Sequence, residues 1–462
     1  MDPALLEWCL RLVACRSVTA EGTRQVAELC ASEMLAPAGI TARLIASTRE
    51  GAEQVNLVAS IRGREASLRP IVLNTHLDTV PPGAPELWTA CGGDPYTARV
   101  DGDRIYGLGA ADTKLDLAAK VFALTAIRTP RRDVHLVGSF GEEHGLTGAR
   151  EIVEAAILPA VALAFVGEPS RLEVITAHKG LMVFELRLGF TPLRIDEPTQ
   201  VRRMTFAGKA AHSSTPALGV NAIEIALQAM AINPKLNLAA ISGGTAVNVV
   251  PARCDVVVAT DAALDVPIGG ATQTQNFDGR IAEIIPLEVI TMTTRFIAAL
   301  RRYADSNGGE EPGYSAPTLT CNPGVIRSAS GSMTLEFELR PPPALALDDV
   351  RAGVTRVVEE ISRTAVGMSV TLGEKRANPG FRAAAASETV EIAMGALASA
   401  GLELKSGVKA GCTEAGVYAA AGLEPVVIGP GPSTGVIHAP NEYNFLSDVE
   451  AAVRFYRALL DM

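Results

Sequence analysis

His76 and Asp78 are the first residues of this chain whose types and spacing could support chemistry. They follow the apolar run Ile71-Val72-Leu73, which predicts a short buried strand that ends before Pro81-Pro82-Gly83. Residues two apart on a strand point to the same face. A histidine held by a carboxylate is the usual arrangement of a metal ligand and its supporting partner. The alternative is a solvated histidine and aspartate at a strand end.

Four further loops place a carboxylate or an imidazole beside glycines, next to predicted strands and helices. The candidates are Asp112, Glu142 with Glu143, Glu168 and His438. Taken singly, each has an ordinary explanation: Asp112 also fits a helix N-cap, acidic pairs are usually solvated, and a loop histidine needs no function. Five such loops in one chain predict a shared site at the strand ends.

Two histidines and three carboxylates match a site for two divalent ions, with Zn²⁺ or Co²⁺ bound by nitrogen and oxygen ligands and no thiolate. Asp112, Glu143 and Glu168 supply three negative charges toward the four positive charges of such a pair. A bound zinc ion lowers the pKa of its water to about 7, so hydroxide is available at neutral pH. Glu142, next to a ligand, is the candidate base that takes the proton from this water and passes it to the leaving group.

The elements that must position these residues alternate between helix and strand. The spacing predicts helices over 3–16, 21–36, 115–128 and 147–156, strands over 41–46, 56–61, 134–140 and 161–166, and a hairpin over 96–106. This alternation predicts an α/β fold with a mixed, largely parallel sheet covered by helices on both faces. In such sheets the chemistry collects at strand ends.

Composition excludes several classes of function. The 462 residues are 48% hydrophobic and 20% charged, which suits one large or two ordinary domains with a real core. A net charge of −10 argues against nucleic acid and anionic membranes as main partners. The seven cysteines show no paired spacing, so we expect a reducing, cytoplasmic compartment. We expect no signal peptide, no membrane span and no strong internal repeat.

The motifs, taken together, resemble the metallopeptidase family that contains acetylornithine deacetylase, succinyl-diaminopimelate desuccinylase, carboxypeptidase G and aminoacylase. They run in family order over nearly the whole chain. The motifs that carry the resemblance are His76-Leu77-Asp78-Thr79-Val80-Pro81, Tyr106 to Lys114, Gly141-Glu142-Glu143, Gly167-Glu168-Pro169-Ser170, Ala177-His178-Lys179-Gly180, Gly208 to Ser214, Gly243 to Pro251 and His438-Ala439-Pro440-Asn441-Glu442. Tyr106-Gly107-Leu108-Gly109 and Gly411-Cys412-Thr413-Glu414-Ala415 are most similar to the acetylornithine deacetylase branch.

The resemblance implies roles for the candidate residues. His76 and Glu168 are expected to bind one metal, Glu143 and His438 the other, and Asp112 to bridge them, followed by an often cis peptide. Asp78 is expected to orient His76, and Glu142 to act as the general base. The implied ions are Zn²⁺ as the first choice and Co²⁺ as the alternative.

The resemblance also implies a smaller α+β lid domain inserted into the catalytic domain. Residues 1–179 and 378–462 would form the catalytic domain, and 180–377 the insert, which usually mediates dimerisation. The implied assembly is a homodimer in which His212 polarises the scissile carbonyl in the partner's active site. The alternative for His212 is a plain turn histidine near Pro216.

The resemblance also makes three residues candidates for substrate binding. Asn248 would bind the substrate's carboxylate or carbonyl. Arg340 resembles the lid arginine that grips a free carboxylate with its planar fork, with a surface arginine as the alternative. Glu414 would meet a cationic substrate side chain or be structural.

The insert departs from the family pattern over 261–330, which has no recognised counterpart. There the sequence predicts a flexible loop at Gly269–Asn276, a helix over Leu287–Tyr303 and a further loop at Asn307–Pro312. This enlargement places Arg340 far along the chain from Asn248. Additions of this size could narrow the cleft, change the partner interface or abolish dimerisation.

The function that follows is a metal-dependent amidohydrolase acting on an N-acyl amino acid, with N-acetylornithine as the first guess. A carboxypeptidase or dipeptidase of the same family is the alternative, because the same machinery cuts a peptide bond. A third possibility is a non-catalytic binding member. The presence of all five ligand candidates and of Glu142 argues against it.

Overall fold

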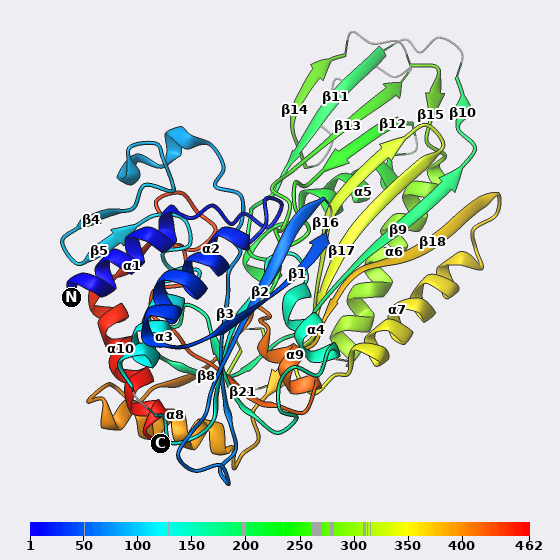
Figure 1. The fold of residues 1–462 in the computed structure, drawn as a ribbon. Helices are drawn as coiled ribbons and strands as arrows, with labels where there is room; N and C mark the ends of the chain where they lie inside the picture. The colour runs from blue at the N-terminus through cyan, green and yellow to red at the C-terminus, as the bar shows by residue number, and fades with distance from the viewer. Residues whose placement is uncertain are drawn as a thin grey trace. The chain divides into compact units, whose positions relative to one another are not determined.

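The chain divides into two compact units, which are described separately (Figure 1). Unit 1 comprises Met1–His178 and Gly380–Met462, and unit 2 comprises Lys179–Pro379. This computed structural model describes residues 1–49, 51–127, 129–195, 200–233, 235–260, 270–277, 281–307, 311, 313–314 and 316–462.

A nine-stranded mixed sheet forms the centre of unit 1, in the order β1-β2-β6-β3-β7-β21-β8-β19 with β20 paired to β8. Strand β3 runs parallel to β6 and β7, and β7 runs parallel to β21. All six residues of β3 are buried, as expected for a parallel strand covered on both faces. The strands are β1 (Ala42–Arg49), β2 (Ala52–Ile61), β3 (Ile71–His76), β6 (Val134–Ser139), β7 (Leu163–Gly167), β8 (Val174–His178), β19 (Phe381–Arg382), β20 (Ser406–Lys409) and β21 (Glu424–Val427).

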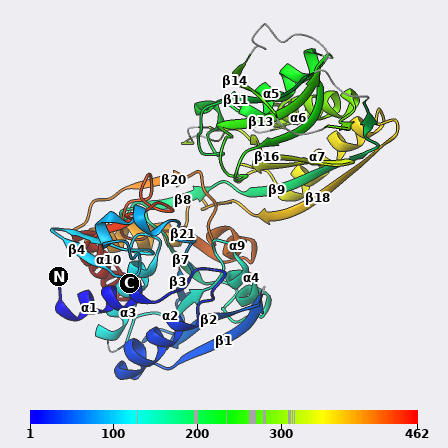
Figure 2. The ribbon, with the colours of Figure 1, turned by 90° about the horizontal axis from the view of Figure 1, so that it is seen from above.

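Helices cover both faces of this sheet, as Figure 2 shows. One hydrophobic cluster packs α1, α2, α3, α8 and α10 on one face, and a second packs α4 and α9 on the other. The predicted fold class is therefore confirmed. The helices are α1 (Pro3–Ala14), α2 (Arg24–Leu29, continued by π and 3-10 turns to Ala38), α3 (Lys114–Ala126), α4 (Thr147–Glu154), α8 (Glu388–Ser399), α9 (Ala415–Ala420) and α10 (Leu446–Leu460).

A small three-stranded sheet, in the order β22-β5-β4, joins the hairpin before α3 to the C-terminal segment. Tyr443 pairs with Tyr106 in it, which brings the His438 and Asp112 loops toward each other although they are far apart in the sequence. Its strands are β4 (Arg99–Asp101), β5 (Arg104–Tyr106) and β22 (Tyr443–Phe445).

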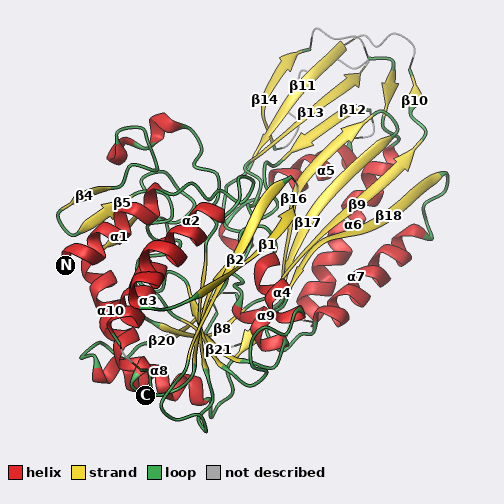
Figure 3. Cartoon of the chain, viewed as in Figure 1, coloured by secondary structure: helices red, strands yellow, loops and turns green. Residues whose placement is uncertain are grey.

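Unit 2 is an eight-stranded antiparallel sheet in the order β14-β11-β13-β12-β16-β17-β9-β18, with α5, α6 and α7 on one face (Figure 3). Phe337 sits in its core, stacked on Phe184 and edge-on to Phe296. The elements are β9 (Leu181–Phe190), β11 (Gln200–Ala207), α5 (Ala222–Ile232), β12 (Asn237–Gly243), β13 (Arg253–Thr260), β14 (Ala271–Asn276), α6 (Leu287–Asn307), β16 (Thr320–Ala329), β17 (Ser332–Arg340), α7 (Leu347–Ser362) and β18 (Met368–Asn378), with a side pair β10 (Leu193–Arg194) and β15 (Glu283–Ile284).

The described residues of the enlarged part of the insert include a strand where the sequence predicts a loop. The predicted loop at Gly269–Asn276 was wrong for Ala271–Asn276, which form strand β14 paired with β11. Its side chains are almost all exposed, so a polar composition suits this edge strand. The predicted loop at Asn307–Pro312 lies mostly outside the described residues. Among the helices that are described, none is long and apolar enough to cross a membrane.

Candidate metal centre

The candidate residues of unit 1 gather where three neighbouring strands end. His76 is the last residue of β3, Glu168 directly follows β7, and Glu142 and Glu143 lie in the turn after β6. The parallel register places His76 opposite Ser139 of β6. Because the carboxyl ends of parallel strands meet at one edge of a sheet, this topology delivers all four side chains to one place.

These residues and two from other loops form two groups of possible metal ligands. One group is His76, Glu142 and Glu168, and the other is Asp112, Glu143 and His438. Within each group, one ligand atom per residue lies within 4.8 Å of the others. The structure thus brings together every residue for which a metal or general-base role was predicted.

Asp112 connects the two groups. Its Oδ1 lies 3.0 Å from His76 Nε2, and its Oδ2 lies 3.2 Å from His438 Nε2. His438 Nε2 also lies 3.0 Å from Glu143 Oε1. One carboxylate oxygen therefore faces each histidine, which is the geometry that a carboxylate bridging two ions requires. The Asp112–Thr113 peptide bond is cis.

Asp78 contacts both His76 and the turn that carries Glu142 and Glu143. His76 Nδ1 lies 3.0 Å from the Asp78 carbonyl oxygen and 3.6 Å from its Oδ1. A proton on Nδ1 shared with that carbonyl leaves Nε2 as the lone-pair donor facing the cluster. The Asp78 carboxylate also accepts hydrogen bonds from the backbone N–H groups of Glu142, at 3.0 Å, and Glu143, at 3.3 Å. Asp78 therefore holds the acidic turn in place.

The charges of the cluster favour cations. Burial and the neighbouring Glu168 and Glu143 carboxylates raise the pKa of Glu142 well above its usual value, and burial raises the pKa of Glu143. Burial opposes ionisation of Asp112 as well, but His438 and His76 hold the pKa of this carboxyl low. Four carboxylates with two imidazoles form an anionic set of oxygen and nitrogen ligands that fits two divalent ions.

Two residues that sequence reasoning left without a role support the cluster. Glu442 is buried and accepts hydrogen bonds from the backbone N–H groups of Ala111, at 2.8 Å, and Asp112, at 3.0 Å. Burial and the nearby Asp112 raise the pKa of Glu442 to about 8. Lys409, on β20, places Nζ 2.6 Å from Glu168 Oε2. Glu442 belongs to the His438 motif and could have been singled out there, whereas nothing in the sequence around Lys409 points to Glu168.

Glu414 is buried in unit 1, with 1% of its surface exposed. Its Oε2 accepts a hydrogen bond of 2.7 Å from Ser139 Oγ, at the end of β6. Burial raises its pKa to about 7. These contacts favour the structural alternative for Glu414 over a direct role toward a cationic substrate.

His212 lies in unit 2, exposed, after β11. Its Nδ1 accepts a hydrogen bond from the backbone N–H of Ser214, at 3.2 Å, and lies 2.6 Å from Ser214 Oγ. A ring nitrogen that accepts from an N–H carries no proton itself, so neutral His212 has its proton on Nε2. This tautomer can donate a hydrogen bond to a carbonyl oxygen or oxyanion.

Asn248 and Arg340 lie close to the His212 segment within unit 2 despite their separation in the sequence. Ser213 donates its backbone N–H to the Asn248 carbonyl at 3.0 Å. Its hydroxyl also donates to Glu338 Oε1, which accepts from Arg340 Nε at 2.5 Å. Arg340 is only 5% exposed, which excludes the surface-arginine alternative.

In comparisons with known proteins, the chain matches one family model, and the similar proteins carry two kinds of name. The model of peptidase family M20/M25/M40 matches residues 72–462. An acetylornithine deacetylase of Klebsiella pneumoniae is 32% identical over 211 residues, which are 40% of this chain and 48% of that protein. A protein named probable carboxypeptidase, of Aspergillus terreus, is 31% identical over 243 residues, 46% of this chain and 49% of that protein. The chain thus spans about half the length of these curated relatives.

Among solved structures, the aminoacylhistidine dipeptidase of Vibrio alginolyticus has a TM-score of 0.68 with 19% sequence identity. The match covers 100% of this chain and 96% of that one. At this level of identity the likeness concerns the fold.

Proposed function

Because this chain belongs to peptidase family M20/M25/M40, we propose that it is a two-metal amidohydrolase that cleaves the amide bond of an N-acyl amino acid. The observation that carries the proposal is the pair of ligand groups joined by Asp112, with Glu142 inside the first group. Family membership supports a hydrolase; the activity, the metals, the substrate and the residue roles below are proposed.

His76 and Glu168 would hold one ion, Glu143 and His438 the other, and Asp112 would bridge the two. Zn²⁺ is the first choice and Co²⁺ the alternative, since the ligands are imidazole and carboxylate without thiolate. When bound, such ions lower the pKa of water and polarise an amide carbonyl.

Glu142 is the proposed general acid and base. Its carboxylate belongs to the ligand group of His76 and Glu168, and its backbone N–H is anchored on Asp78. Its raised pKa suits a group that must accept a proton from the attacking water and then release it to the leaving amine. Asp78 is a positioning residue for His76 and for the Glu142 turn.

Unit 2 would supply the groups that recognise the substrate. His212, with its proton on Nε2, would donate to the carbonyl oxygen and stabilise the charge that develops on it. Asn248 would bind the substrate's carboxylate or carbonyl, and Arg340 its free carboxylate. Glu338 pairs with Arg340 and fixes the guanidinium.

The first substrate to test is N-acetylornithine. A carboxypeptidase or dipeptidase is the second candidate, favoured by the similarity to the protein named probable carboxypeptidase. Burial of Glu414 weakens the case for a dedicated cationic subsite at that residue. A non-catalytic role is disfavoured because Glu142 lies within the ligand group of His76 and Glu168.

A cytoplasmic location is also proposed. All seven cysteines are unpaired and six of them are buried, which suits a reducing compartment.

The test is a hydrolysis screen of the protein loaded with Zn²⁺ or Co²⁺, with a chelated sample beside each reaction. The panel contains N-acetylornithine, other N-acetyl and N-succinyl amino acids, and simple dipeptides. Chelator-sensitive release of an acyl group supports the proposal. Cleavage of dipeptides alone would favour the peptidase alternative over the proposed amidohydrolase. An absence of turnover with both ions bound would refute the proposed activity.

A further inference from the structure

Unit 2 contains two copies of one strand arrangement. We name the elements β9, α6, β16, β17, α7 and β18 module A, and the elements β11, α5, β12, β13 and β14 module B. Module B is inserted in the chain between β9 and α6 of module A. In both modules a first strand is followed by a helix and then by two strands, and a fourth strand ends the module. In module B, residues 261–269 before that fourth strand lie outside the described part of the chain.

The strand order of the two modules is the same. Numbered within its own module, each set of four strands lies in the order second, third, first, fourth, and all neighbours are antiparallel. The two second strands, β12 and β16, pair with each other antiparallel at the centre of the sheet, with Ser242 opposite Arg327 and Gly243 opposite Ile326. Two halves with the same strand order, joined antiparallel through their equivalent strands, match the arrangement of a two-fold symmetric dimer.

We call the boundary at which β12 of module B pairs with β16 of module A the seam. Both backbone and side-chain groups form contacts across it. The Arg327 guanidinium of module A donates to the carbonyl oxygens of Gly243, the last residue of β12, at 2.5 Å, and of Gly244, at 2.6 Å. A Cβ built on Gly244, whose φ is +72°, would lie 1.8 Å from the Gly324 carbonyl oxygen. The two backbones therefore approach too closely for any other residue at this position.

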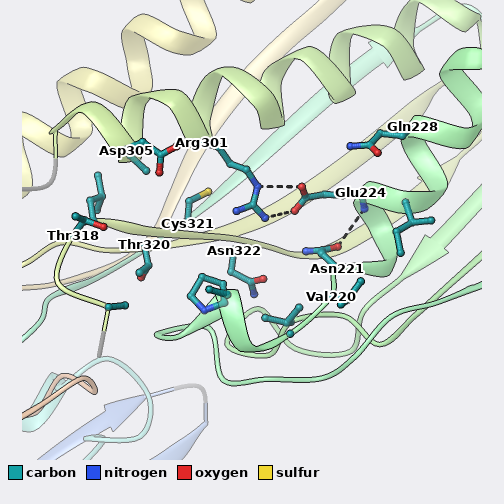
Figure 4. A pocket seen from close by; sticks show the side chains of 18 residues that line it. Val220, Asn221, Glu224, Gln228, Arg301, Asp305, Thr318, Thr320, Cys321 and Asn322 are labelled. Atoms are coloured by element: carbon teal, nitrogen blue, oxygen red, sulfur yellow. Dashed lines mark hydrogen bonds and ion pairs between the residues drawn. The ribbon is translucent and has the colours of Figure 1, made fainter. Parts of the chain in front are cut away.

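The helices that correspond in the two modules, α5 and α6, also meet at the seam (Figure 4). Arg301 of α6 forms an ion pair with Glu224 of α5, with Nε 3.0 Å from Oε2. Asn221, at the start of α5, donates to the Pro323 carbonyl of β16 at 2.8 Å. Arg301, Glu224 and Asn221 line a pocket of about 530 Å³ between α5, α6 and β16.

The seam also unites the proposed substrate-binding residues. Module B carries His212 and Asn248, and module A carries Arg340. Asn322 of module A, 1% exposed, donates to the carbonyls of Val247, at 2.9 Å, and Val249, at 3.1 Å, on either side of Asn248. Glu338 of module A accepts from Ser213 of module B and from Arg340. The residues proposed to bind the substrate therefore come from both modules.

We infer that module B takes, within this chain, the place that the insert domain of a second copy would take in a dimer. The edges of β12 and β16 that a symmetric pairing would use are already paired with each other. A second copy would then not be needed to supply this half of the sheet, and His212 would act in the chain that carries it. The role of His212 rests on the proposed function, whereas the internal pairing does not.

Two inactive variants, Glu142→Gln and His212→Ala, test the inference by co-expression with different affinity tags, followed by isolation of any species that carries both tags. If His212 acted in a partner's site, the co-expressed mixture would regain about a quarter of the wild-type activity, because half of the dimers would hold one intact site, and the isolated doubly tagged dimer would regain about half. We expect no activity above the sum of the separate variants. Recovery near these levels would overturn the inference.

Sedimentation of the wild-type protein gives a second, independent readout. We expect a single species of 48.3 kDa at all concentrations, with and without Zn²⁺. A stable species of twice this mass would overturn the inference. If the wild type hydrolyses nothing in the screen, the proposed function fails, while sedimentation still decides whether a second copy is required.

Discussion

The metal-ligand cluster of unit 1 and the seam of unit 2 both join segments that are far apart in the sequence, but they do so with opposite electrostatics. In the cluster, four buried or half-buried carboxylates crowd two imidazoles, and Lys409 is paired with Glu168 at its edge. At the seam, Arg327 and Asn322 donate to backbone carbonyls, and Arg301 pairs with Glu224. The donors named at the seam all have partners within unit 2, whereas the carboxylates of the cluster carry an excess of negative charge.

This difference separates a site that needs a bound group from an interface that holds itself together. Buried charge of one sign costs free energy unless a counter-charge is supplied, so the cluster should respond strongly to metal. Hydrogen bonds and ion pairs between groups of the chain contribute less each and do not depend on an added ligand. Variants and ligand removal should therefore affect the two regions by different routes.

The largest effect is expected for Glu142→Gln. The amide keeps the size of the side chain but cannot accept a proton, so kcat should fall by about 10²- to 10⁴-fold. Both ions should stay bound, because the five proposed ligands are intact. Steady-state kinetics with metal analysis of the same sample checks this. Glu403→Gln, at a largely exposed position, is the matched control, and a Glu142→Gln rate equal to it would remove the general-base role.

His76→Ala should separate metal binding from folding. Removal of a direct ligand should weaken binding of one ion by more than about 100-fold, since even an outer partner of a ligand costs 10- to 100-fold. Titration with Zn²⁺ followed by metal analysis measures the loss. Retention of both ions at wild-type affinity would refute the ligand role, and an unchanged circular dichroism spectrum would show that the fold persists.

Removal of the metals should destabilise unit 1 and leave unit 2 unaffected. An ion present at about 1,000 times its Kd stabilises the folded state by about 4 kcal/mol, and chelation removes this term and exposes the repulsion among Glu142, Glu143 and Glu168. Calorimetry with and without chelator should show a lower melting temperature for one transition. Equal shifts in both transitions, or none in a sample shown to be metal-free, would contradict the electrostatic contrast.

The metal centre could be predicted from sequence because its chemistry depends on residue type. Histidines and carboxylates stand out beside glycines at the ends of apolar runs, and parallel strands bring such ends together. The supporting contacts were less visible. Lys409 shows no pattern in the sequence, and its contact with Glu168 depends on the pairing of β20 with β8.

The two modules could not be predicted from the sequence. They share strand order and not residues, so no repeat is visible along the chain. Strand β14 is a polar edge strand with almost no buried side chains, and it therefore lacks the alternation that predicts a strand. Asn248 and Arg340 are also far apart along the chain, because Asn248 lies in module B and Arg340 ends a strand of module A. The pairing of the two modules in one sheet brings them back together.

At the seam, Asn322→Ala should act on substrate binding through Asn248. It removes two hydrogen bonds and leaves the Val247 and Val249 carbonyls without these partners, which should cost about 1–3 kcal/mol of stability. We expect KM to rise more than kcat falls and the metal content to stay unchanged. Asn444→Ala, in unit 1, is a matched loss of a buried asparagine. A Zn²⁺ affinity changed by Asn322→Ala would contradict the independence of the two regions.

The smallest effect should come from the Arg301–Glu224 pair on α5 and α6. The two side chains are 38% and 19% exposed, so water screens the pair and its coupling should be below about 1 kcal/mol. A double-mutant cycle with Arg301→Gln and Glu224→Gln, followed by denaturant unfolding, measures this coupling directly. The Arg351–Asp348 pair within α7, which lies away from the seam, is the control. A coupling of several kcal/mol would mean that charge governs the stability of the seam, as it does that of the metal cluster. A small coupling would assign the stability of the seam to strand pairing and to the hydrogen bonds of Arg327 and Asn322.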